Sequence, residues 1–140
     1  MVMGPISLQG EYIRTHLDRN SSSSVVFDGW YTYATWTLTG KSREYDTGNG
    51  RFRTIMPIKS LGNEGIGAWE LGLRYSNIDL NDQDIVGGEE DNITFALNWY
   101  PNKNIRFSAN YINVLDVDRP GFESDGENPD IFQVRGQVQF

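Results

Sequence analysis

Apolar and polar residues alternate along the end of the chain, over residues 130–140. The even-numbered residues from Phe132 to Phe140 are apolar or glycine, whereas the odd-numbered ones from Gln133 onward are glutamines and Arg135. Because successive side chains of a strand point to opposite faces, this pattern predicts a strand with one apolar and one polar face. Such a strand closes an outer-membrane barrel, but it also occurs half-buried in a water-soluble sheet. The rest of the chain has to distinguish the two.

Five further segments show the same period of two and predict strands: 6–12, 27–39, 68–80, 93–100 and 105–114. Together with the last segment they make six strands of roughly 9–12 residues, a length that spans a bilayer when the strand is tilted. Within 27–39, tyrosines and threonines form one face and the set containing Trp30 and Trp36 forms the other. We predict that the tryptophan set lies on the apolar face.

The connections between these segments differ in character from one side of the sheet to the other. Those at 15–26, 80–91 and 115–130 are polar loops, and the last two are acidic. The opposite side has a short turn at 100–104 and a long connection at 40–66. Aromatic residues gather at strand ends, where a bilayer interface would place them: Trp30, Trp69, Trp99 and Tyr100. The loop asymmetry and the aromatics together predict an all-β fold of antiparallel transmembrane β-barrel strands rather than a soluble sandwich.

Composition narrows the picture further. The 140 residues are 38% hydrophobic and suffice for one domain, 1–140, but they contain no long apolar run that would predict a transmembrane helix. Without cysteine, disulfides and thiolate metal sites are excluded. The net charge of −7 argues against nucleic acid as a partner. The first residues lack the basic and apolar regions of a signal peptide, so we expect a chain trimmed from a longer precursor.

Several short motifs resemble the phosphate-selective porin O and P family, in its carboxyl-terminal portion. They are Gln9-Gly10-Glu11-Tyr12, Trp36-Thr37-Leu38-Thr39-Gly40, Gly67-Ala68-Trp69-Glu70-Leu71-Gly72-Leu73-Arg74-Tyr75-Ser76, Asn98-Trp99-Tyr100-Pro101-Asn102 and the terminal Phe140. Each motif is short and strand-like, and it is their order and spacing from about Pro5 onward that is specific.

The resemblance implies a fold and a function. Members of that family are sixteen-stranded, trimeric porins of the bacterial outer membrane, roughly three times as long as this chain, and some conduct anions such as phosphate. The chain then corresponds to the last six strands, too few to close a barrel without strands from elsewhere. We expect passive diffusion without a cofactor or an enzymatic reaction. The expected partners are membrane lipid, lipopolysaccharide, phosphate-like anions and further copies in a trimer.

Three arginines fall on the polar side of three different strands: Arg74, Arg106 and Arg135. Guanidinium groups fixed along a water-filled pore would attract phosphate-like anions through forked hydrogen bonds. We therefore predict that these arginines line an anion path. The alternative is that they pair with carboxylates on the same face, for which Glu11 and Glu70 are the candidates.

A second basic set lies in the long connection 40–66, and we predict that it surrounds the periplasmic mouth: Lys41, Arg43, Arg51, Arg53 and Lys59. Such residues could gather or release anions, although a basic cluster in a solvated loop often serves solubility alone. No metal site is predicted, since Asp84 stands where the calcium-binding loop of a helix–loop–helix needs glycine.

Two other functions stay open at this point. A barrel that does not conduct could use its acidic loops to bind a partner or lipopolysaccharide. A barrel enzyme is the weaker alternative, because His16, the single histidine, has no nucleophile or carboxylate arranged with it in the sequence.

Overall fold

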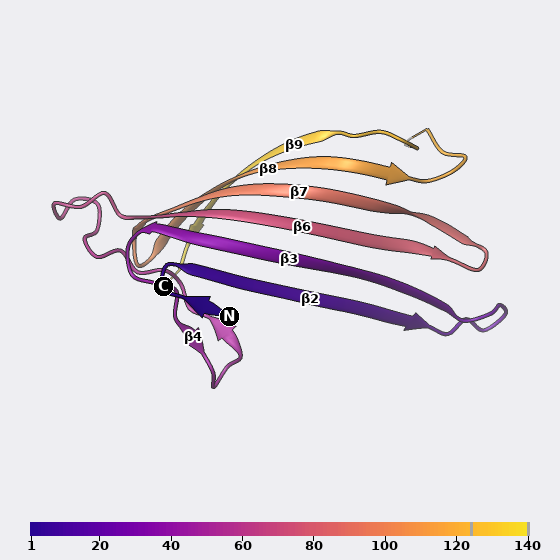
Figure 1. The fold of residues 1–140 in the computed structure, drawn as a ribbon, viewed down its shortest axis with the longest axis horizontal. Helices are drawn as coiled ribbons and strands as arrows, with labels where there is room; N and C mark the ends of the chain where they lie inside the picture. Colours follow the sequence, from indigo (N-terminus) through magenta and orange to yellow (C-terminus); the bar gives the residue numbers. More distant parts are fainter. Residues whose placement is uncertain (124, 140) are drawn as a thin grey trace.

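The computed structural model describes residues 1–123 and 125–139, and it is an all-β protein (Figure 1). The long strands of this part of the chain are β2 (Ile6–Leu17), β3 (Val25–Thr39), β6 (Ala68–Asp82), β7 (Ile85–Asn102), β8 (Ile105–Asp118) and β9 (Asp130–Val138). The short strands are β1 (Val2–Met3), β4 (Tyr45–Asp46) and β5 (Arg51–Phe52). Within the described residues no helix is long and apolar enough to cross a membrane.

The long strands form one antiparallel sheet in which each strand pairs with its neighbours along the chain. The order is β1-β2-β3-β6-β7-β8-β9, so the six predicted strands are confirmed and a short strand, β1, is added at one edge. The sheet curves but does not close into a barrel (Figure 1). The small hairpin β4–β5 stands apart as a sheet of its own.

The register shows which residues share a face, because residues directly opposite one another in an antiparallel pair point to the same side. One row across the sheet is apolar: Ile6, Trp36, Leu71, Leu97, Ala109 and Val134. The next row, on the opposite face, is mostly polar: Ser7, Thr35, Gly72, Ala96, Asn110 and Gln133. We name the first side the aromatic face, and the second, which carries Arg74, Arg106 and Arg135, the arginine face.

The predicted assignment of residues to faces is confirmed across the sheet. Trp36 of β3 lies opposite Leu71, so the tryptophan set of that strand belongs to the aromatic face. In β9, Phe132 and Val134 pair with Tyr111 and Ala109 of the same face. The predicted apolar position of Phe140 lies outside the described residues.

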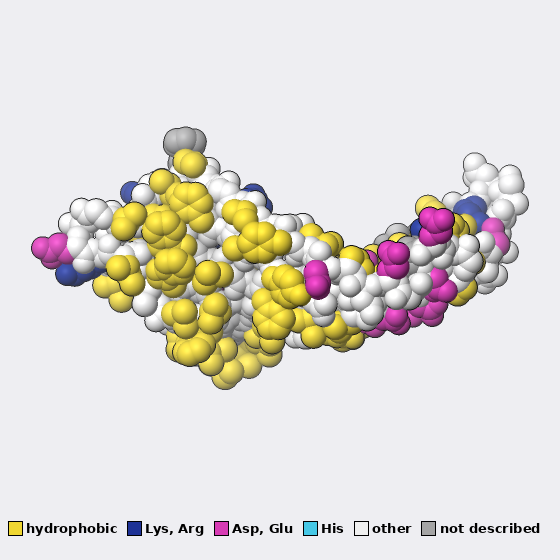
Figure 2. Space-filling view, turned by 90° about the horizontal axis from the view of Figure 1, so that it is seen from above, with side chains coloured by type: hydrophobic (Ala, Val, Ile, Leu, Met, Phe, Trp, Pro, Cys, Tyr) yellow, Lys and Arg dark blue, Asp and Glu magenta, His cyan; other side chains and the backbone are white. Residues whose placement is uncertain are grey.

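Burial in this sheet is the reverse of that in a water-soluble protein. On the aromatic face, Phe95 is 53% exposed and Phe132 is 70% exposed. On the arginine face, Thr35, Glu70 and Asn98 are buried. Figure 2 shows hydrophobic side chains covering one half of the visible surface and carboxylates along the other half.

The two ends of the sheet are distinct. One end carries the loop 18–24, the β6–β7 turn and the loop 119–129, and we name it the acidic end. The other carries the segment 40–67 and the β7–β8 turn at 103–104, and we name it the basic end. The predicted separation of the connections into two sides is therefore confirmed.

One predicted loop is wrong. Residues 80–91, expected as an acidic loop, are mostly strand, and only Gln83 and Asp84 form the turn between β6 and β7. Gln83 adopts a left-handed backbone conformation with φ of 53°, as a tight hairpin turn requires. The acidic residues are accommodated because Asn77 donates hydrogen bonds to Glu89 at 2.8 Å and to Asp91 at 3.2 Å. The six long strands, at 9 to 18 residues, are accordingly longer than predicted in most cases.

The long connection at 40–66 is folded against the sheet. It contains the hairpin β4–β5, and Ile55 is buried with Ala68 and Tyr100 in a small apolar cluster. Gly40, with φ of +117°, lets the chain leave β3 closely, since a Cβ there would lie 2.7 Å from that of Ala68. The segment therefore has a fixed position at the basic end.

Candidate functional site

The three predicted arginines come together on the arginine face. Arg74 of β6, Arg106 of β8 and Arg135 of β9 line one hollow of about 680 Å³. Its remaining walls include Tyr33 of β3 and Asn98 of β7. We name it the polar hollow. The three arginines are far apart in the sequence. They share one surface because side chains alternate along each strand and because the register aligns the three strands.

Two of these arginines are held by uncharged neighbours. The guanidinium carbon of Arg74 lies 4.6 Å from the centre of the Tyr31 ring. Arg106 donates a 2.9 Å hydrogen bond to Asn98 Oδ1, and its guanidinium carbon is 5.5 Å from the centre of the Tyr100 ring. Among the described residues, no carboxylate lies within ion-pair distance of any of the three arginines.

The two candidate carboxylates have other partners. Glu70 is fully buried and accepts hydrogen bonds from Arg43 at 2.5 Å and from the Asn98 amide and the Tyr100 hydroxyl at 3.0 Å each. Glu11 accepts a 3.0 Å hydrogen bond from the Tyr31 hydroxyl. The charge of Glu70 is therefore balanced by Arg43, and the positive charge of the polar hollow has no direct carboxylate partner in the described structure.

Arg43 is the basic residue of the long connection that contacts the arginine face most closely. Its guanidinium reaches Glu70 from the segment 40–67 and lies 5.9 Å from the centre of the Phe52 ring. Together with Arg53 and Arg106 it lines a smaller cavity of about 130 Å³ between the segment and the sheet. The segment therefore lies over the arginine face at the basic end.

The other basic residues of that connection stay at its surface. Arg53 lies 3.6 Å from Glu44 and 3.5 Å from Asp46 of its own hairpin. Lys59 lies 3.5 Å from Glu64, while Lys41 and Arg51 are exposed. The geometry thus separates Arg43, which ties the segment to the sheet, from the four residues around it.

The sequence did not predict the uncharged side chains that contact the arginines of the polar hollow, and one aromatic residue, Tyr100, was wrongly grouped with the aromatics of the bilayer interface. Trp99 stacks with Trp69 at 5.5 Å and Phe107 at 5.6 Å between ring centres on the aromatic face. Tyr100, predicted to lie with them at the bilayer interface, points to the arginine face and is buried. The signal for its role was available, because the alternation of 93–100 already places Tyr100 on the same side as Asn98.

Comparison with known proteins agrees with this architecture. The family described as phosphate-selective porin O and P matches residues 1–140. The chain is 33% identical to Porin O of Pseudomonas aeruginosa over 99% of its own length and 33% of that protein's length. It is also 42% identical to an uncharacterised protein of Caulobacter vibrioides over 61% of its own length and 17% of that protein's length. The chain therefore spans about a third, or less, of the relatives it matches. It belongs to the phosphate-selective porin O and P family.

Proposed function

We propose that the chain forms part of the wall of an outer-membrane porin in which small anions diffuse past the arginine face. The observation that carries this proposal is the polar hollow, where three guanidinium groups from three strands share one surface and pair with no carboxylate of residues 1–123 and 125–139. A phosphate-like anion passing there would exchange hydration water for forked guanidinium donors. The relatives' names point in the same direction.

The two faces support the membrane part of the proposal. A face that exposes Trp36, Phe95 and Phe132 to water would be unfavourable by about 25 cal/mol for each Å² of apolar surface. Contact with lipid hydrocarbon removes that penalty, and the arginine face then borders the water-filled lumen. The two edges of the open sheet, at β2 with β1 and at β9, would need further strands as partners in lipid. In this arrangement the basic end is the periplasmic mouth.

The long connection contributes at that mouth. Arg43, Phe52 and Thr54 share a cavity with Arg106 and Gln137 of the arginine face, which supports a position of the segment 40–67 inside the lumen, where it would narrow the pore. The exposed charges of Lys41, Arg51, Arg53 and Lys59 then surround the opening and raise the local concentration of anions.

The test uses Porin O of Pseudomonas aeruginosa with the matched third replaced by these 140 residues. Its currents are measured across planar bilayers in a potassium chloride gradient. We expect anion selectivity, and we expect Arg74→Ala, Arg106→Ala and Arg135→Ala together to lower the chloride-to-potassium permeability ratio about threefold or more. Each unit charge about 7 Å from the ion contributes roughly RT even in bulk water.

A control removes a charge outside the polar hollow, through Arg14→Ala, at an exposed position on the aromatic face. We expect this variant to leave the permeability ratio close to that of the unaltered chimera. An unchanged ratio in the triple variant would contradict the anion path. A chimera that inserts but carries no current would instead favour a barrel that binds partners through its acidic end.

A further inference from the structure

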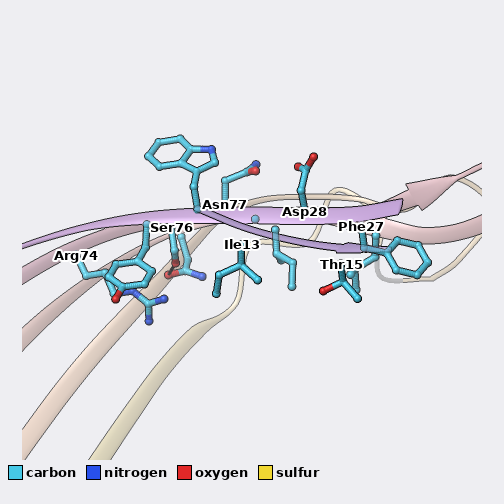
Figure 3. A pocket seen from close by; sticks show the side chains of 13 residues that line it. Ile13, Thr15, Phe27, Asp28, Arg74, Ser76 and Asn77 are labelled. Carbon is cyan, nitrogen blue, oxygen red and sulfur yellow. Dashed lines mark hydrogen bonds between the residues drawn. The ribbon is translucent and has the colours of Figure 1, made fainter. Parts of the chain in front are cut away.

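A second hollow lies on the arginine face nearer the acidic end, and a group of apolar side chains forms part of its walls. It measures about 350 Å³ and is lined by Ile13 of β2, Phe27 of β3, and Ile78 and Leu80 of β6, with Arg74 at one side. We name it the apolar hollow. Its polar lining residues include Thr15, Ser76, Asn92, Asp28 and Asn77, and the last two point to the opposite side of the sheet (Figure 3). Figure 3 shows Ile13, Thr15, Phe27 and Arg74 on the same side of the sheet.

The register confirms that these apolar residues belong to the arginine face. Ile13 pairs with Gly29, and Gly29 pairs with Ile78, two positions along the strands from the row that contains Glu11, Tyr31 and Ser76. Ile13 is 54% exposed and Ile78 is 44% exposed. Gly29 leaves the space between them free of a side chain, and a Cβ there would lie only 3.0 Å from the Asn77 backbone oxygen.

Arg74 borders both hollows. It lines the polar hollow with Arg106 and Arg135, and it lines the apolar hollow with Ile13 and Ile78. Its position is set by the ring of Tyr31. Tyr31 is in turn fixed by a hydrogen bond from Gln9 at 2.8 Å and one to Glu11 at 3.0 Å. A positioned cation therefore stands at the boundary between an apolar surface and a basic one.

We propose that this boundary is a binding site for organic anions that carry a compact apolar group, such as aryl phosphates and aryl carboxylates. The anionic head accepts hydrogen bonds from the Arg74 guanidinium and faces Arg106 and Arg135. The apolar group packs against Ile13, Phe27 and Ile78, which removes exposed apolar surface of both partners from water. The proposal rests on the proposed function, since it names a solute class for the same lumen.

The test compares phenyl phosphate with inorganic phosphate as blockers of the chloride current through the chimeric porin described above. We expect phenyl phosphate to block at a concentration about tenfold lower than inorganic phosphate, because the phenyl ring gains apolar contacts that inorganic phosphate lacks. Ile78→Thr with Ile13→Thr should reduce this preference to about twofold or less while leaving block by inorganic phosphate unchanged. Arg74→Gln should weaken block by both anions.

Ile131→Thr is the matched control, since Ile131 is 42% exposed on the same face but does not line the apolar hollow. Equal block by the two anions in an anion-selective chimera would overturn the site and leave the proposed function standing. A preference that survives Ile78→Thr with Ile13→Thr would also overturn it. Loss of anion selectivity altogether would instead contradict the proposed function.

A second measurement does not depend on any variant. The chimeric porin, in lipid nanodiscs, is titrated with phenyl phosphate and with inorganic phosphate, and the phosphorus-31 resonance of each is followed. Selective broadening of the phenyl phosphate resonance supports the site. Identical behaviour of the two resonances contradicts it.

Discussion

The basic and acidic ends of the same sheet are held together in different ways. At the basic end, a buried carboxylate, Glu70, joins three side chains, and Ile55 packs the long connection against Tyr100. At the acidic end, the hairpins extend as strands with irregularities at Asp79/Asn81 and Asp91/Asn92, and an ion pair between Arg19 and the exposed Asp84 links two of them. The comparison indicates that a buried polar network and a buried apolar cluster lie together where the long connection packs on the sheet.

The largest effect on stability is expected from removing the charge of Glu70. In Glu70→Gln the guanidinium of Arg43 keeps its largely buried position but loses its counter-charge. We expect the free energy of unfolding in lipid vesicles, measured by urea titration, to fall by about 3 kcal/mol.

Glu44→Gln is the control for that substitution. Glu44 is 70% exposed and lies 3.6 Å from Arg53, so its loss should change the free energy of unfolding by about 1 kcal/mol or less. If the two substitutions lowered the free energy of unfolding by similar amounts, the buried network around Glu70 would stabilise the fold no more than a surface ion pair does.

A smaller effect is expected from the apolar contact of the long connection. Ile55→Ala leaves a cavity beside Ala68 and Tyr100, and we expect it to lower the free energy of unfolding by about 2 kcal/mol. Limited proteolysis should then cut the segment 40–67 faster. Ile58→Ala, at a side chain that is 73% exposed, should leave both measurements nearly unchanged. A segment that is cut equally fast in both variants would contradict its anchoring by Ile55.

The smallest effect is expected at the acidic end and depends on pH. Two hydrogen bonds from the Arg19 guanidinium, of 2.5 and 3.0 Å, lower the pKa of the Asp84 carboxyl in the folded protein. A lowered pKa means that the ion pair stabilises the folded state above the ordinary value of 3.8. That stabilisation is lost as the pH falls through the lowered value.

Amide hydrogen exchange of residues 18–24 measures this loss. We expect exchange, corrected for its intrinsic pH dependence, to accelerate below pH 3.8 in the unaltered protein. In Asp84→Asn it should be fast throughout and show no such step. A step that persists in Asp84→Asn would assign the pH dependence to another group.

The sheet could be predicted from the sequence because both the facing of each side chain and the pairing of neighbouring strands depend on residues close together in the chain. The period of two fixes the face of each residue, and short polar connections fix which strands are neighbours. Phe132 and Arg135 were therefore assigned to opposite faces correctly. The same local rule failed at 80–91, because acidic and glycine-rich residues indicate a loop unless their cross-strand partners are known.

The environment of the candidate site could be predicted only in part. Arg74, Arg106 and Arg135 share a face by alternation alone, but their proximity depends on the register between strands. The positively charged partner of Glu70, Arg43, lies in the long connection, 27 positions before it, and nothing in the local pattern relates the two residues. Irregular segments carry no period from which a contact with the sheet can be deduced.

The strict pairing of chain neighbours makes the sheet a series of three hairpins, β2–β3, β6–β7 and β8–β9. Contacts between segments close in sequence form early and quickly, so each hairpin can fold as its own unit before the next is added. Gain or loss of one hairpin keeps the number of strands even and leaves the pairing within each remaining hairpin intact. Pores of different diameter can therefore arise within one lineage by duplication or deletion of single hairpins.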